Sequence, residues 1–288
     1  MEAARRELDR MRSSSVVWPE LRYERATGAD GYDCDGNAAR RAMVLWALQY
    51  DRRAEDLPLV RWLAEQEAWC RREAPFQGLT EETELAGFLL AEHRQVEDVW
   101  LHWEIKQANF DTWCGYDLEH LFAAGVEATI AFVRDNGHAD RNDVLERLLD
   151  QEGQPCLSED DVAAWSQHRR SRFPADPAAE DLLTWVGRAK LAGDRELARQ
   201  WLDRWEAGRH RDKGTLSQLR CRGWRRAPCR QLRESSSQRI RRRAMTPGSI
   251  RRTHRLHARS ARRTCSYSAT NLGLYRAILL VAQKRSGQ

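Results

Sequence analysis

Residues 57–73 read LPLVRWLAEQEAWCRRE, and this stretch decides the fold class. Its large apolar residues follow the three- and four-residue spacing of one helix face: Leu59, Trp62, Leu63, Trp69 and Cys70. Pro58 stands in the first turn, where a helix tolerates proline because that N–H has no helical partner. The stretch therefore predicts an amphipathic α-helix whose tryptophans belong to a core.

The same periodicity recurs along the first 208 residues, whereas runs of β-branched residues with alternating polarity are nearly absent. Ser158 with Asp161 three residues later has the form of a capping box, and Gly137 suits a left-handed helix end. The pattern predicts an all-α protein with helices over residues 38–50, 57–73, 80–93, 96–108, 117–134, 141–151, 160–167, 177–191 and 194–207.

The predicted helices follow one another in pairs with short breaks, and one apolar face per helix needs a neighbour to cover it. Stacked helical hairpins of the α-solenoid kind would provide that cover. The spacing from pair to pair is irregular, so a compact, irregular helical domain is the alternative. We expect an irregular N-terminal segment with a short helix over residues 1–36, a helical body over 37–208, and a basic, disordered tail over 209–288.

One window resembles a known repeat family. Residues 189–202 read AKLAGDRELARQWL, in which Gly193 and Asp194 form the turn and Ala198 follows four residues after the aspartate. Around Gly193–Trp201 this resembles the helix–turn–helix of a tetratricopeptide repeat, over about 20 residues. The resemblance implies a scaffold that binds proteins or peptides.

The charge is divided unevenly along the chain. The whole chain carries 48 Lys and Arg against 43 Asp and Glu, but residues 209–288 hold 22 of the bases and only two of the acids, so this segment is at +20 and residues 1–208 are at −15. Such a tail predicts phosphate contacts, and hence nucleic acid as an alternative partner, through Arg241, Arg242, Arg243, Arg251 and Arg252. Out-of-frame translation of a GC-rich gene would give a similar composition, so a frameshifted tail is a further hypothesis.

The connection around residues 109–117 is rich in aromatic and acidic side chains. Tryptophan and tyrosine are common interface anchors, and loops often carry recognition. We predict partner binding by Trp103, Asn109, Asp111, Trp113 and Tyr116. In the competing interpretation, Trp113 fills the junction between two helix pairs.

The sequence shows no recognisable reaction centre. It lacks the phosphate-binding, nucleophile-elbow and dinucleotide motifs, and its histidines and cysteines do not have metal-ligand spacing. We therefore expect no catalytic residue, no bound metal and no cofactor.

The seven cysteines are odd in number and widely spaced, and no signal peptide or membrane-spanning run is present, which predicts a cytoplasmic protein. The leading hypothesis is a non-catalytic helical-repeat scaffold for a protein or peptide partner. Nucleic-acid binding is the alternative, and an enzyme of unrecognised type is the third.

Overall fold

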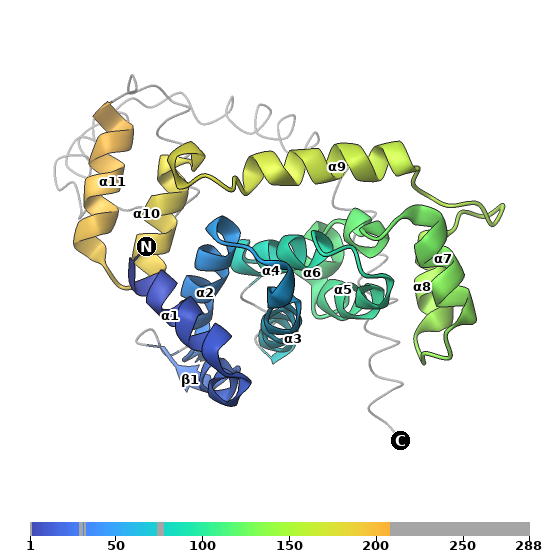
Figure 1. Cartoon of the computed structure of the whole chain (residues 1–288), viewed down its shortest axis with the longest axis horizontal. Helices are drawn as coiled ribbons and strands as arrows, with labels where there is room; N and C mark the ends of the chain where they lie inside the picture. The colour runs from blue at the N-terminus through green and yellow to red at the C-terminus, as the bar shows by residue number, and fades with distance from the viewer. Residues whose placement is uncertain (1, 29–30, 32, 74–77, 208–288) are drawn as a thin grey trace, which may run out of the picture. The chain divides into compact units, whose positions relative to one another are not determined.

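The chain is helical, as its periodicity predicts. The computed structural model describes residues 2–28, 31, 33–73 and 78–207 (Figure 1). In these residues the chain forms eleven α-helices, five short 3-10 helices and one two-stranded ribbon, which confirms the all-α prediction. The predictions for residues 209–288, including the five arginines assigned to phosphate contacts, lie outside the described residues.

The elements of the described residues fall into two successive sets. The first comprises α1 (Glu2–Ser13), η1 (Ser15–Leu21), β1 (Arg25–Thr27), β2 (Asp33–Asp35), α2 (Ala38–Tyr50), η2 (Ala54–Asp56), α3 (Leu57–Glu73) and α4 (Glu81–Ala91). The second comprises η4 (Val96–Asp98), α5 (Val99–Lys106), α6 (Phe110–Gly115), η5 (Leu118–Phe122), α7 (Val126–Asp135), α8 (Arg141–Leu148), α9 (Glu159–Arg172), η6 (Pro177–Ala179), α10 (Leu182–Leu191) and α11 (Arg195–Ala207).

Local capping chemistry explains where several of these helices begin. Thr80 accepts a hydrogen bond from the Thr83 N–H at the start of α4. The negative charges of three glutamates in the first turn also stabilise the positive end of the helix dipole. Ser158 and Asp161 form the predicted capping box of α9, with reciprocal side-chain and backbone hydrogen bonds. Each cap satisfies N–H groups that the helix itself leaves without partners.

Two clusters contain most of the buried apolar residues in the described part of the chain. Residues of α1, α2, α3 and α4 form the first, in which Leu45 and Leu63 are fully buried. The second joins α5, η5, α7, α8 and α9 around Phe122 and Val133. Helix α5 links the two clusters, because its Ile105 belongs to the first and its Val99 to the second.

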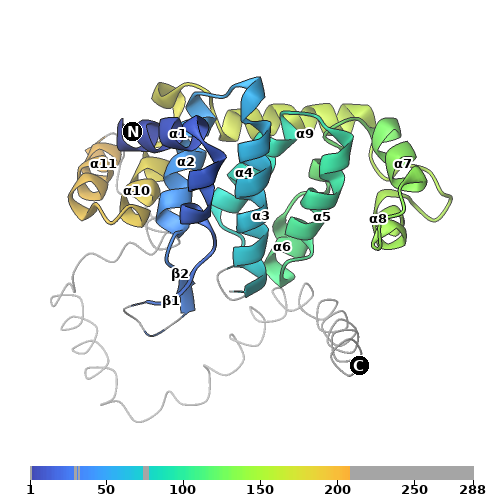
Figure 2. The same cartoon turned by 60° about the horizontal axis from the view of Figure 1, so that its bottom comes forward.

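After α9 the chain returns to its N-terminal helices. Arg188 of α10 donates to Gln49 Oε1 at 2.6 Å and to the Tyr50 hydroxyl at 2.5 Å, so α10 lies beside α2 (Figures 1 and 2). The Arg188 guanidinium faces the rings of Trp46, Tyr50 and Trp185 within 5.6 Å of each centroid. In a solenoid each hairpin meets only its neighbours, so these contacts match the compact alternative.

The predicted helix over residues 117–134 is wrong in its N-terminal half. Residues 118–122 form the 3-10 helix η5, and α7 begins only after Gly125, which has a φ of 116°. A left-handed residue cannot continue an α-helix, so the apolar spacing spans two elements. The predicted left-handed end at Gly137 is also wrong, because Gly137 is not among the positive-φ glycines of the described residues.

The window that resembles a tetratricopeptide repeat forms the helical hairpin α10–α11. Gly193 has a φ of 78°, Asp194 accepts the Leu197 N–H at 2.9 Å, and Ala198 is fully buried. A small residue at this position lets the paired helices approach closely. Membership of the repeat family stays a prediction.

No helix in the described residues combines the length and apolar character needed to cross a membrane.

We expect Gly87→Ala to destabilise the protein by about 1–3 kcal/mol, because the added methyl group would overpack the core. Gly87 lies in α4 against the Tyr116 ring, and a Cβ there would stand 2.1 Å from the tyrosine oxygen and 2.7 Å from its Cε2. Urea unfolding followed by circular dichroism measures the change.

Gly187→Ala in α10 is the matched control, since a Cβ there meets nothing within 4 Å. Alanine is the better helix former, so we expect this change to stabilise the protein by about 0.5–1 kcal/mol. Equal, stabilising effects of the two substitutions would contradict close packing of α4 on Tyr116.

Candidate functional site

The structure does not bring the five residues predicted to bind a partner onto one exposed surface. Trp103 and Tyr116 are buried, with exposed fractions of 4% and 1%, whereas Asp111 is exposed on α6. Asn109 caps α6 by accepting the Thr112 N–H and donates to the Arg71 carbonyl oxygen at 3.1 Å. The two buried rings have no surface to offer a partner, so this set does not form one interface.

Trp113 lies where the competing interpretation puts it, at a junction of helices. Its ring stands edge-on to Trp103 with centroids 5.8 Å apart, and Lys106 and Arg147 face it at 5.9 and 5.3 Å. The buried Lys106 ammonium also donates to the carbonyl oxygens of Trp113 and Tyr116. Desolvation, followed by repulsion from Arg147, lowers the pKa of Lys106 to about 8.

Two histidines form a closed cluster with Tyr116. His102 Nδ1 is 2.7 Å from the Tyr116 oxygen, and the His120 ring stacks on the tyrosine with centroids 4.1 Å apart. Both ring nitrogens of His120 are buried and have no hydrogen-bond partner among the described residues. Burial lowers the pKa of His102 to about 3 and that of His120 well below its usual value, so both imidazoles are neutral.

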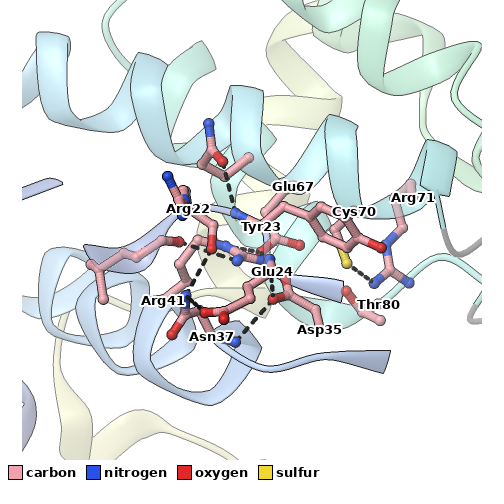
Figure 3. A network of polar contacts seen from close by, with 12 residues as sticks. Arg22, Tyr23, Glu24, Asp35, Asn37, Arg41, Glu67, Cys70, Arg71 and Thr80 are labelled. Atoms are coloured by element: carbon pink, nitrogen blue, oxygen red, sulfur yellow. Dashed lines mark hydrogen bonds and ion pairs between the residues drawn. The ribbon is translucent and has the colours of Figure 1, made fainter. Parts of the chain in front are cut away.

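A buried ion-pair network lies between α2, α3 and the ribbon (Figure 3). The fully buried Arg41 guanidinium donates to Glu67 Oε1 at 3.0 Å and pairs with Asp35 Oδ2 at 2.6 Å. Thr83 donates to the second oxygen of Glu67, and Asp35 accepts the Asn37 N–H. Burial opposes the charge of Arg41, but Glu67 and Asp35 outweigh it and raise the pKa of the guanidinium. The network holds the ribbon to the helices.

These interior clusters are closed to a partner, but a groove of about 590 Å³ opens between α3 and α5, which lie side by side (Figure 2). The first wall is one face of α3. Its residues are three, four or eight positions apart in the sequence, which places them on the same side of the helix. Helix α5 and the adjoining η4 form the second wall. The lining residues are Arg61, Glu65, Gln66, Trp69, Arg72, Glu97, Asp98, Trp100, Leu101 and Glu104.

The aromatic side chains of the groove differ in how they are held. Trp69 is 49% exposed, which is unusual for so large an apolar ring, and Arg72 of its own helix covers it at 5.6 Å. Trp100 is half-buried and stacks on His138, with ring centroids 4.0 Å apart and planes 10° apart. The groove therefore has one fixed indole and one that is open to solvent.

The groove is negatively charged, because four carboxylates and two guanidiniums give it a formal charge of −2. Arg61 pairs with Asp98 at 2.6 Å and with Glu97 at 3.1 Å, so both carboxylates at this end have a guanidinium within hydrogen-bonding distance and the end carries a formal charge of −1. At the other end Arg72 is 3.8 Å from Glu104. Glu65 has no ion pair among the described residues, and partial burial together with the nearby Glu104 raises the pKa of Glu65. Each end therefore carries a formal charge of −1, and the less firmly paired carboxylates, Glu65 and Glu104, lie at the same end.

Within the described residues, no group of three or more His, Cys, Asp and Glu side chains is placed to hold a metal ion. The expectation of no catalytic residue, metal or cofactor stays a prediction.

Sequence reasoning missed the groove because it assigned Trp69 to the core face of α3. A signal was present: Arg61, Glu65 and Trp69 are spaced by four residues and form one polar row with a single aromatic member.

Comparisons of the chain with protein-family models, with curated proteins and with solved structures gave no match.

Proposed function

We propose that this chain is a helical scaffold that binds a segment of a partner protein in the α3–α5 groove. The proposal includes a cytoplasmic location and no chemistry of the chain's own. The observation that carries it is the exposed ring of Trp69 in a concave, charged surface. Tryptophan is enriched among the residues that dominate binding energy at protein interfaces.

Burial of the exposed half of Trp69 under a partner would contribute on the order of 3 kcal/mol. The charged residues at both ends of the groove supply a polar rim, and rim charges contribute mainly to orientation and to the rate of encounter. The groove thus has an apolar centre and a polar rim, which is the usual composition of a protein–protein interface. Its carboxylates would repel phosphate, so the groove favours a protein over a nucleic acid.

The test uses a photo-crosslinking amino acid, p-benzoylphenylalanine, in place of Trp69 in the full chain. We expect one protein to be crosslinked from this position and not from Leu197 of α11, an exposed apolar residue that does not line the groove. The purified captured protein should bind the Trp69→Ala variant at least about 30-fold more weakly than the wild-type chain, which corresponds to about 2 kcal/mol.

Leu197→Ala is the matched control and should leave the dissociation constant within about two-fold, because Leu197 lies outside the groove. Both side chains are partly exposed, so neither change should alter the free energy of unfolding by more than about 1 kcal/mol. Equal binding by wild-type and Trp69→Ala chains, or capture from Leu197 alone, would contradict the proposal.

A further inference from the structure

We propose that the segment bound in the groove is basic, and that one of its arginine or lysine side chains lies on Trp69 between Glu65 and Glu104. This inference rests on the proposed function, and it adds the chemical class of the partner. Aspartate-rich, neutral or purely apolar segments are the alternatives that the experiment distinguishes.

The first argument is the distribution of charge in the groove. Arg61 donates hydrogen bonds to both Glu97 and Asp98, and the Asp98 side chain is 6% exposed, so each carboxylate at this end already has a guanidinium partner. Glu65 has no ion pair among the described residues, and Glu104 is 48% exposed with its nearest guanidinium nitrogen at 3.8 Å. Two partly unpaired carboxylates beside an indole ring attract a cation by charge and by the ring quadrupole.

The second argument is that the chain already places a guanidinium at this position. Arg72 covers the Trp69 ring at 5.6 Å and approaches Glu104, yet its side chain is 41% exposed and makes no hydrogen bond to Glu104 within 3.5 Å. Exposed ion pairs of this kind contribute only about 0–1 kcal/mol. Arg72 is therefore a weakly held occupant that an incoming arginine can replace.

The third argument is the charge of the surrounding chain. Residues 1–208 carry a formal charge of −15 and residues 209–288 one of +20, so attraction of a basic segment to residues 1–208 is general and not confined to the groove. General attraction of this kind falls with salt, whereas contacts to specific carboxylates in a groove depend on their positions. The experiment must therefore distinguish general charge attraction from contacts to Glu65 and Glu104.

The probe is a short fluorescein-labelled peptide that alternates arginine and alanine, titrated with the full chain at 0.15 M salt and followed by fluorescence anisotropy. A peptide with citrulline in place of arginine keeps the shape and removes the charge. We expect the citrulline peptide to bind at least about 10-fold more weakly. The +20 charge of residues 209–288 would favour a glutamate–alanine peptide, and any binding of that peptide should not be weakened by Glu65→Gln/Glu104→Gln.

Two groove carboxylates are then compared with two others. The double variant Glu65→Gln/Glu104→Gln should weaken arginine-peptide binding by about 10-fold. The control Glu127→Gln/Glu146→Gln removes the same net charge from exposed positions in α7 and α8, and it should change binding by less than about two-fold.

The most specific result concerns Arg72. Removal of a resident competitor should tighten binding, so we expect Arg72→Ala to bind the arginine peptide about 3- to 5-fold more tightly. Arg195→Ala in α11 makes the same change in net charge at an exposed position away from the groove, and it should have no measurable effect.

Equal binding of the arginine and citrulline peptides, equal effects of the two glutamate pairs, or weaker binding by Arg72→Ala would overturn the inference. So would absence of arginine-peptide binding to the wild-type chain. In each of these cases the proposed function would still hold if a partner protein were captured at Trp69 and its affinity depended on Trp69. Failure of the crosslinking test at Trp69 would instead remove the proposed function itself.

Discussion

Arg41→Ala is expected to destabilise the protein by about 3–5 kcal/mol, because it leaves two buried carboxylates without their cation. The Arg41 side chain is fully buried, and its partners Asp35 and Glu67 are 0% and 4% exposed. Denaturation by urea, followed by far-ultraviolet circular dichroism of the full chain, measures the loss. A free energy of unfolding of about 5–15 kcal/mol is usual, so much of the stability would be lost.

The neighbouring residue supplies the control. Arg40 pairs with Glu7 and Glu20 at the surface with a side chain that is 39% exposed, so Arg40→Ala should cost less than about 1 kcal/mol. Glu67→Gln keeps the shape of the side chain and removes one charge, and it should give an intermediate loss if Arg41→Ala is too unstable to purify. Similar losses for Arg40→Ala and Arg41→Ala would show that the network does not hold the ribbon.

The second large effect is acid destabilisation through His102 and His120. Burial lowers both folded-state pKa values below about 6.5, the value of an unfolded histidine, so the unfolded chain binds more protons as the pH falls. Stability is therefore retained above pH 6.5 and lost below it, by about 1.4 kcal/mol per pH unit for each imidazole. From pH 7 to pH 5 we therefore expect a progressive loss of stability to which both imidazoles contribute.

His120→Phe isolates this effect, because neither ring nitrogen of His120 makes a hydrogen bond within the part of the chain that the structure describes. The variant should keep its stability at pH 7 and should lose about 1.4 kcal/mol per pH unit less than the wild-type chain below pH 6. His168→Gln changes an exposed histidine of α9 and should leave the slope unaltered. A slope in His120→Phe equal to that of the wild type would show that His120 is protonated in the folded state.

Helix positions could be predicted from the sequence wherever apolar periodicity coincided with a single helix. The bounds expected for α2 and α3 agree with the structure, and α4 lies within its predicted range. The prediction was wrong at residues 117–134 because apolar spacing is blind to backbone conformation: Gly125 fits the apolar pattern but adopts a φ that ends a helix. The six-residue helix α6 was missed because it is too short to show a period and is held by a cap at Asn109.

Long-range polar contacts could not be predicted from one sequence. The pairing of Arg41 with Glu67 and of Arg188 with Gln49 joins residues that are far apart along the chain, and arginine on a predicted helix is ordinarily solvent-exposed. The groove was missed for a related reason. Periodicity identifies the apolar face of α3, but it does not show which part of that face the neighbouring helices leave exposed. Trp69 lies at the edge between the covered and the exposed parts.

Trp100 lines the groove on one side and rests on His138 on the other, while His138 Nδ1 in turn accepts the Asp140 N–H at 3.1 Å. The position of the Trp100 indole is therefore fixed by its contact with the turn between α7 and α8. Selection for a particular ligand in the groove would therefore also act on the residues of this surface turn, although the turn does not line the groove. Changes in that turn would alter recognition by tilting the ring and would leave every lining residue in place.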